Sequence, residues 1–228
     1  MDIINQIVKK KLNLSNITLF CYENRYIDKA IEAIEICKHY ADFGSIKFIT
    51  NNKTGYEHEI IDNTSINSLS DYSRFILFKL NGYVDTDFVL TVHADGFITN
   101  PLAWTNEFLS YDYIGATWYN QMGLFRDNKY LVGNGGFSLR SKKLLNELDY
   151  ILPQINNPRS MHNHEDIVIC HQLRDYLESR GIRFAPIEIA DKFSVETKGK
   201  WNGEFGFHNF KFVNPENFGW VNPLKNNC

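Results

Sequence analysis

The sequence predicts an α/β fold in which a single mixed, mostly parallel sheet is flanked by helices. Near the N-terminus, two short apolar runs, Ile17 to Tyr22 and Ile46 to Thr50, flank a segment from Asn24 to Tyr40 whose apolar residues recur with helical spacing. A further helical segment precedes a third apolar run, Phe88 to Val92. Strands that alternate with helices form parallel sheets, because each helix crosses over a face of the sheet.

Further helices and strands follow along the chain. Ser70 and Asp71 can cap a helix that runs to Leu80, and the next two residues, Asn81-Gly82, are typical of a left-handed C-cap. Later segments predict a strand at 137–140, a helix at 142–150, a helix from 165 that ends at Gly181 and a strand at 182–186. Because there is no repeat or linker, we expect one domain over 1–228, with an amphipathic extension at 1–16 and a C-terminal tail at 210–228.

Composition and charge favour an ordinary globular protein. The formal net charge is -3 with no long run of one sign, which gives no reason to expect nucleic acid or an anionic membrane as a partner. No apolar stretch approaches the roughly 18 residues that span a bilayer, and the N-terminus is too polar for a signal peptide. The four cysteines form no Cys-x-x-Cys pair, so we expect reduced thiols and a cytoplasmic location. A peripheral association with a membrane-bound glycan pathway stays compatible with these features.

The strand at 88–92 ends in His93-Ala94-Asp95, followed by Gly96. In an extended chain, residues i and i+2 point the same way, so both polar side chains can face one ligand. A carboxylate beside an imidazole suits Mn²⁺ or a similar divalent ion, which would in turn hold a diphosphate. The alternative is a turn, because Asp-Gly is common turn chemistry and His93 could hydrogen-bond a neighbouring strand.

Gly133-Asn134-Gly135-Gly136 concentrates three glycines in four residues. Such a run indicates backbone that lies close to a bulky group or adopts positive φ angles. A sugar or phosphate packed on this backbone is one explanation, and a tight turn before the following strand is the other. The fingerprint G-x-G-x-x-G is absent, so a Rossmann dinucleotide site is not supported.

Two histidine-containing segments complete the candidate residues. In the segment from His162 to Asp166 (HNHED), Asn163 can cap a helix whose first turn is acidic, although the same residues could supply a base or a zinc site. No clean spacing to further zinc ligands is present. His208 lies among phenylalanines, where a histidine is more often a hydrogen-bonded core residue than a ligand.

Read in order, the motifs HADGF…NP, YDYIGA.W, GNGGFSLRS, ED and FGFH resemble a glycosyltransferase of the GT-A type, especially the β-1,4-galactosyltransferase branch. They are more similar still to a set of mostly uncharacterised bacterial and viral glycosyltransferase-like domains. The resemblance runs from about Ile17 to Asn209. It implies a GT-A fold and the transfer of a sugar from a nucleotide-sugar donor to a glycan hydroxyl, with inversion at the anomeric carbon.

On the donor side, the resemblance assigns Asp95 and His208 to a divalent ion, Mn²⁺ or Mg²⁺. His93 stands where the branch has the first aspartate of Asp-x-Asp, and Arg74 resembles an arginine that touches the nucleotide. A UDP-sugar is the implied donor because the resembled branch uses it. We also assign Cys21 and Tyr22 to the donor, because ligands of open α/β sheets gather at the C-terminal ends of strands.

On the acceptor side, Gly135 and Gly136 match the Gly-Gly-x-Ser strand of the branch. Its Glu-Asp pair matches Glu165, which would bind acceptor hydroxyls, and Asp166, which would take the acceptor proton. At a helix start, the macrodipole is expected to lower the pKa of Asp166. Trp118 offers a stacking face for a sugar ring. The Trp-Gly-rich loop that precedes the pair in the branch is missing, so the acceptor cannot be assigned.

Two other functions stay open. A non-catalytic glycan-binding domain could keep the fold without the chemistry, and the presence of His93 in place of an aspartate favours this alternative. A nucleotidyltransferase could share the strand–helix–strand opening, but it would use a nucleoside triphosphate and release pyrophosphate.

Overall fold

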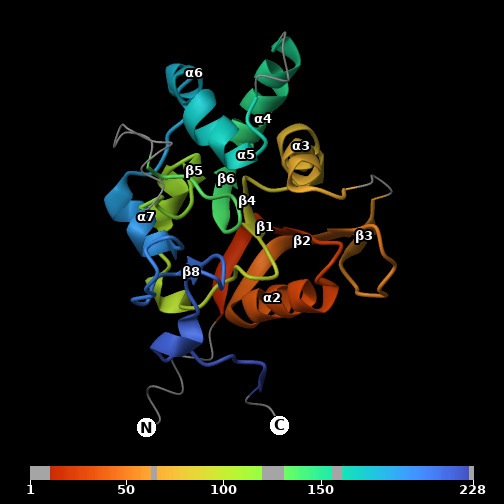
Figure 1. Ribbon diagram of the computed structural model, residues 1–228, viewed down its shortest axis with the longest axis vertical. Coiled ribbons are helices and arrows are strands. Elements are labelled where there is room, and N and C mark those ends of the chain that lie inside the picture. Colours follow the sequence, from red (N-terminus) through yellow and green to blue (C-terminus); the bar gives the residue numbers. More distant parts are fainter. Residues whose placement is uncertain (1–10, 63–65, 120–130, 156–160, 226–228) are drawn as a thin grey trace.

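A six-stranded sheet in the order β3-β2-β1-β4-β6-β5 forms the centre of the molecule (Figure 1). The computed structural model describes residues 11–62, 66–119, 131–155 and 161–225. β1 pairs in parallel with β2 and β4, β2 pairs in parallel with β3, and β6 is antiparallel to both of its neighbours. The structure therefore confirms the predicted mixed, mostly parallel sheet flanked by helices.

The described residues form one main sheet, one small sheet and six α-helices. The main sheet contains β1 (Leu12–Tyr22), β2 (Ala41–Thr50), β3 (Glu59–Ile61), β4 (Phe88–Val92), β5 (Tyr113–Ile114) and β6 (Ser138–Ser141), and the small sheet pairs β7 (Ser194–Val195) with β8 (Gly206–Phe207). The helices of the described residues are α2 (Ile27–Tyr40), α3 (Leu69–Lys79), α4 (Lys142–Ile151), α5 (Glu165–Ile167), α6 (Arg174–Ser179) and α7 (Ile187–Phe193).

The central strand β1 shows why the sheet is buried on both faces. Leu19 and Cys21 pack into the apolar cluster that contains α2, whereas Phe20 and Tyr22 pack into a second cluster that contains α3 and α4. Successive side chains of a strand point to opposite faces, so a strand covered on both sides needs a continuous apolar run. The helices lie on the two faces accordingly (Figure 1).

The ends of α3 differ from the prediction. The helix begins two residues earlier than expected, because Ser68 caps it in a capping box: Ser68 Oγ accepts from Asp71 N–H at 3.1 Å, and Asp71 Oδ2 accepts from Ser68 N–H at 3.0 Å. The expected left-handed C-cap is wrong, since Gly82 has no positive φ and the chain continues as a 3₁₀ turn over Leu80–Tyr83. This turn keeps Leu80 fully buried.

The second half of the chain confirms α4 and corrects two later elements. The helix expected at 165–181 is split by a π-helical turn over Val168–Gln172, and its last segment, α6, ends at Ser179, two residues before Gly181, whose φ is 78°. The strand expected at 182–186 is absent, and one bridge from Phe184 to Tyr113 takes its place. Pro186 lacks the N–H that a strand ladder needs, and it instead precedes the first turn of α7.

Parts of the expected N-terminal extension and of the expected C-terminal tail belong to the folded domain. β1 already begins at Leu12, which pairs with Ala41, so the expected boundary at residue 16 lies inside a strand. In the tail, Val213 and Trp220 are buried in the core, and the Trp220 ring lies 5.4 Å from that of Phe97. Residues 1–10 and 226–228 of these segments lie outside the described residues. Among the described helices, none combines the length and apolar character that crossing a bilayer requires.

Candidate functional site

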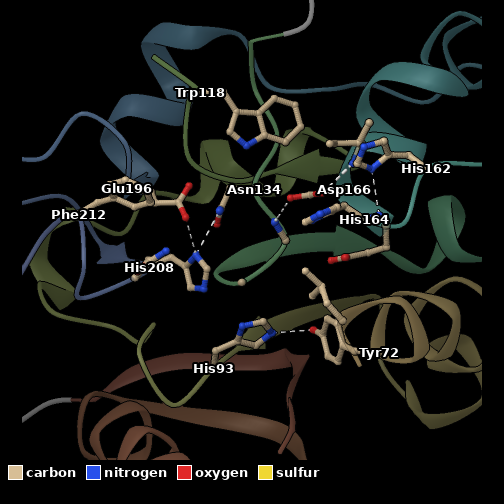
Figure 2. Close-up of a pocket in the computed structure, with 16 residues that line it drawn as sticks. Tyr72, His93, Trp118, Asn134, His162, His164, Asp166, Glu196, His208 and Phe212 are labelled. Atoms are coloured by element: carbon tan, nitrogen blue, oxygen red, sulfur yellow. Dashed lines mark hydrogen bonds and ion pairs between the residues drawn. The ribbon is translucent and has the colours of Figure 1, made fainter. Parts of the chain in front are cut away.

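A pocket of about 570 Å³ opens beyond the C-terminal end of β4 (Figure 2). The strand runs into a tight turn closed by two backbone hydrogen bonds, in which His93 N–H donates to Gly96 O and Gly96 N–H donates to His93 O, both at 3.1 Å. The turn expected from Asp-Gly is therefore present, and it carries His93 to the pocket. Four of the seven histidines of the chain line this pocket, which makes it rich in imidazole.

The histidine cluster, defined as His93, Asp95 and His208, brings three metal-capable side chains together. One ligand atom from each residue lies within 4.8 Å of the other two. His208 Nε2 lies 3.6 Å from Asp95 Oδ1, and the two imidazole rings are 5.3 Å apart. Two imidazoles and one carboxylate suit a divalent transition-metal ion. The His93-x-Asp95 motif predicts a cation site, the resemblance adds His208 to it, and the structure brings these three side chains together.

Burial and neighbouring charges act in opposite directions on the two histidines. Burial, followed by the nearby charge of His208, lowers the pKa of His93 to about 4, so His93 is neutral at physiological pH. Burial also acts to lower the pKa of His208, but its hydrogen bond to Glu196 and the charges of Glu196 and Asp95 raise that pKa overall. The cluster therefore combines a neutral imidazole with a more basic one.

Each histidine of the cluster has an outer partner that the sequence did not single out. The Tyr72 hydroxyl lies 2.7 Å from His93 Nε2, and Glu196 Oε1 lies 3.0 Å from His208 Nδ1. Glu196 directly follows β7, whose residue Val195 pairs with Phe207 of β8. Only this pairing between distant segments sets Glu196 beside His208, and no local pattern in the sequence signals it.

The opposite side of the pocket, the carboxylate side, is formed by Glu165 and Asp166 at the start of α5. Glu165 Oε1 accepts from Arg140 Nη2 at 3.0 Å, and the side chains of Arg140 and Glu165 are 0% and 5% exposed. Ser73 Oγ donates to the other oxygen, Oε2, at 3.2 Å. Arg140 Nε in turn donates to Ser138 Oγ at 3.1 Å. Glu165 is therefore a buried, charge-compensated carboxylate with both oxygens occupied.

Asp166 has a different environment from its neighbour. Its Oδ2 accepts from Gly135 N–H at 3.1 Å, and its Oδ1 accepts from Ile167 N–H at 2.8 Å. Burial, followed by the negative charge of Glu165, raises the pKa of Asp166 to about 7. The expectation of a lowered pKa is wrong, because α5 is only three residues long and these two effects outweigh its dipole.

The two adjacent glycines lie between the two sides of the pocket. A Cβ on Gly135 would lie 1.9 Å from Glu165 Oε1, and a Cβ on Gly136 would lie 2.1 Å from His208 Nε2. Both glycines line the pocket, as expected. The bulky groups that pack against this backbone are, however, side chains of the protein itself. The absence of a side chain at Gly135 lets Glu165 pack against the backbone, and its absence at Gly136 does the same for His208.

The segment at 162–166 contributes side chains to the pocket, and its helix starts at Glu165 as expected but without the expected cap. His162 and His164 both line the pocket, and His164 N–H donates to His162 Nδ1 at 3.1 Å. The N-cap of α5 is His164, without a side-chain cap, so the capping role expected of Asn163 is wrong. The metal-capable cluster found among the described residues includes neither His162 nor His164, which gives no support to a zinc site there.

Two residues expected at the donor lie away from the pocket. Arg74 is exposed on α3, with its guanidinium carbon 5.7 Å from the centre of the Phe78 ring. Cys21 is 1% exposed in the core, where burial raises the pKa of its thiol. Neither residue lines the pocket, so direct contact with a ligand in this conformation is not supported for either of them.

A second pocket, the adjoining pocket, continues from the first. It has a volume of about 260 Å³ and shares Leu69, Tyr72 and His93 with the main pocket. Tyr22 lines it, as expected for a residue at the end of β1. Arg25 also lines it and donates to Asn67 O at 2.8 Å. The cationic side chain beside this pocket is therefore Arg25, whereas the sequence had indicated Arg74.

The aromatic surface of the main pocket also differs from the expectation. Trp118 lines the pocket but is only 3% exposed, and a Cβ on Gly133 would lie 1.9 Å from its ring, so the indole face is largely covered. Phe212 lines the same pocket and is 45% exposed. Figure 2 places Phe212 on the same side as Glu196 and His208. Phe212 therefore offers the larger aromatic surface to a ligand.

Comparison with known proteins supports the fold and identifies a family. No curated protein matches the chain significantly. Among solved structures, a chain described as "Crystal structure of a glycosyltransferase involved in the glycosylation of the major capsid of PBCV-1" is similar, with a TM-score of 0.52 and 14% sequence identity over 84% of this chain and 91% of that chain. At this identity the likeness establishes a shared fold. The family model described as "Protein of unknown function (DUF5672)" matches residues 55–208, more than half of the chain, and the protein therefore belongs to this family.

Proposed function

We propose that this protein is a glycosyltransferase that moves a sugar from a nucleotide-sugar donor to a glycan hydroxyl, with inversion at the anomeric carbon. The observation that carries the proposal is that one pocket is lined by Asp166 on one side and by His93 and His208 of the histidine cluster on the other, with Asp95 beside His208. An inverting transfer needs a base for the acceptor and a means to stabilise the departing diphosphate. The fold shared with a glycosyltransferase supports the same conclusion.

The adjoining pocket fits the nucleotide part of the donor. It lies at the C-terminal end of β1, where open α/β sheets bind nucleotides, and it meets the main pocket at His93. Tyr26, which is 61% exposed, supplies aromatic surface for a base, and Arg25 supplies a positive charge for a phosphate. A UDP-sugar is the donor that we favour, on the strength of the resemblance to the galactosyltransferase branch.

The histidine cluster has the donor atoms and the space for a divalent cation. Gly96 and Gly136 leave room for the His208 ring, since a Cβ at either position would come within 3.0 Å of it. His93, Asp95 and His208 would hold the ion, with Mn²⁺ as the expected cation. A divalent cation bound there would neutralise charge that develops on the departing diphosphate.

Asp166 takes the proton of the acceptor hydroxyl as that oxygen attacks the anomeric carbon, while the bond from this carbon to the diphosphate oxygen breaks. A pKa of about 7 suits a general base at neutral pH, and such a base contributes about 10²- to 10⁴-fold to a rate. Both oxygens of Glu165 already accept hydrogen bonds from the protein, and its charge raises the pKa of Asp166. Other residues therefore contact the acceptor directly. Phe212 provides the surface on which an acceptor sugar stacks.

A thermal-shift panel tests this proposal. UDP, GDP, CMP and dTDP are each added with and without Mn²⁺ to the wild type and to Asp95→Asn. A ligand at 100 times its Kd stabilises the fold by about 2.7 kcal/mol, which gives a clear rise in Tm. We expect a rise for one nucleotide that requires both Mn²⁺ and Asp95, followed by sugar transfer when the matching nucleotide sugar and a glycan are supplied.

The other outcomes separate the alternatives. If no nucleotide raises the Tm, the proposal fails and a glycan-binding domain on the same fold becomes the better explanation. If a nucleoside triphosphate is consumed with release of pyrophosphate, the protein is a nucleotidyltransferase.

A further inference from the structure

His208 has a carboxylate on each side of its ring. Nδ1 lies 3.0 Å from Glu196 Oε1, and Nε2 faces Asp95. An ionised carboxylate can only accept a hydrogen bond, so Nδ1 carries the proton and the neutral ring keeps its lone pair on Nε2. Glu196 therefore leaves the ligand atom of His208 on the side of the histidine cluster.

Asn134 is consistent with this tautomer after one adjustment. Its Nδ2 lies 3.2 Å from His208 Nδ1, and its Oδ1 has no hydrogen-bond partner although it is buried. The contact from Nδ2 would require the opposite tautomer of His208. Glu196 prevails because a hydrogen bond to a charged acceptor is the stronger of the two. Turning the Asn134 amide by 180° brings Oδ1 toward Nδ1–H and removes the conflict.

His93 also has an outer partner on one ring nitrogen, but on Nε2 where His208 has its partner on Nδ1. The Tyr72 hydroxyl occupies Nε2 at 2.7 Å, which leaves Nδ1 as the nitrogen available to a ligand. In Figure 2, Tyr72 and Glu196 lie on the outer sides of the two histidines, whose rings are arranged edge to face with their centres 5.3 Å apart. Hydrogen bonds to the outer nitrogen of a metal-binding histidine fix its ring and its tautomer.

The segments that carry the cluster are also fixed to each other. Asn209 N–H donates to Asp95 O at 2.7 Å, and Phe207 N–H donates to Phe97 O at 3.4 Å. Gly136 packs its backbone against the His208 ring. Two imidazoles held in place beside Asp95, whose backbone is fixed, lose little freedom when a cation binds, which favours binding without help from a second ligand.

We infer that Tyr72 and Glu196 are positioning residues that hold His93 and His208, with Asp95, as a preformed site that binds a transition-metal ion in the absence of any nucleotide. The site prefers Mn²⁺ or Co²⁺ to Mg²⁺, because two of its three ligands are imidazoles and Mg²⁺ prefers oxygen. The inference rests on the proposed function only for the use of the ion, since cation binding can be measured without donor or acceptor.

Isothermal titration calorimetry on chelator-treated, full-length protein without nucleotide tests the inference. We expect one Mn²⁺ or Co²⁺ per chain and binding of Mg²⁺ that is weaker by about tenfold or more. Glu196→Gln and Tyr72→Phe should each weaken Co²⁺ binding by about 10- to 100-fold, as the loss of outer partners does in other metal sites. The visible spectrum of bound Co²⁺ should also change in His93→Ala.

Matched controls separate positioning from general damage. Glu188→Gln, an exposed residue of α7, and Tyr111→Phe remove the same chemical groups outside the cluster and should leave Co²⁺ binding unchanged. Each variant without metal should keep the Tm of the metal-free wild type to within a few degrees. If Tyr72→Phe and Glu196→Gln bind Co²⁺ as tightly as the wild type, or if Mg²⁺ binds as well as Mn²⁺, the inference is wrong.

Failure of this inference and failure of the proposed function give different results. If Co²⁺ binds tightly while no nucleotide raises the Tm, the preformed metal site is supported and the proposed transferase function is rejected. If a nucleotide raises the Tm and Co²⁺ binds only in the presence of that nucleotide, the transferase function is supported and the preformed metal site is rejected.

Discussion

The two sides of the pocket handle charge in different ways. On the carboxylate side, Glu165 has its own cation in Arg140, and both side chains are almost fully buried. On the other side, Asp95 is 42% exposed, and its ion-pair contact is with His208 Nε2 at 3.6 Å. The protein thus neutralises one carboxylate internally and leaves the other open beside two imidazoles. This difference makes the carboxylate side a fixed framework, and it supports our proposal that the histidine cluster takes an external cation.

Burial shifts the titration of both sides toward the neutral form. It raises the pKa of Asp166 to about 7 and lowers the pKa of His93 to about 4. Near neutral pH, the base is thus partly ionised while the His93 ligand is uncharged. Transfer activity should therefore rise as the pH increases through about 7, because more of Asp166 is then in the form that accepts a proton.

The largest effect is expected when Asp166→Asn removes the base. The transfer rate should fall by about 10²- to 10⁴-fold, measured as nucleotide release at saturating substrates. Co²⁺ binding should be unchanged, which serves as the control that the histidine cluster is intact. If Asp166→Asn kept near wild-type rates, the base assignment would be wrong and a retaining mechanism would become the better explanation.

The same variant should be more stable than the wild type. A carboxyl group with a raised pKa in the folded state favours folding when it is protonated, so its ionisation destabilises the fold as the pH rises through about 7. Asn mimics the protonated form. Because Asp166 is only partly buried, we expect a gain of about 1 kcal/mol in the free energy of unfolding at pH 8, and no gain below about pH 4. Urea unfolding at the two pH values measures it.

The second largest effect concerns the internal ion pair. Arg140→Met leaves Glu165 as an unpaired buried charge, which should lower the free energy of unfolding by about 3–5 kcal/mol. The double variant Arg140→Met/Glu165→Gln removes both charges and should recover a large part of that loss. Urea unfolding of the single and double variants measures the coupling. Equal stabilities of the single variant and the wild type would contradict the framework role of this side.

The smallest effect is expected from Gly136→Ala, which probes the histidine cluster alone. The added Cβ would lie 2.1 Å from His208 Nε2, so the ring must move and Co²⁺ affinity should fall by about tenfold. Gly82→Ala is the matched control, because a Cβ at Gly82 meets nothing within 4 Å and its φ is not positive. Unchanged Co²⁺ affinity in Gly136→Ala would show that His208 has more freedom than its contacts indicate.

Local patterns in the sequence determined the elements that carry the pocket. The continuous apolar runs of β1 and β4 and the helical spacing of α2 and α4 are read directly from neighbouring residues, and all four elements form as predicted to within a few residues. The turn at His93 and the paired glycines are equally local signals. The strand expected at 182–186 does not form, because Pro186 lacks the N–H of a strand ladder and instead precedes α7.

Tertiary structure alone decided which side chains meet in the pocket and how they titrate. Glu196 lies beside His208 because β7 pairs with β8. The arginine that lines the adjoining pocket is Arg25, whereas the sequence had indicated Arg74. The pKa of Asp166 follows from burial and from Glu165, which outweigh the short helix that the sequence emphasised. The physical reason is the same in each case. Periodicity and capping depend on residues a few positions apart, whereas burial and contacts between charges depend on segments that only the folded chain brings together.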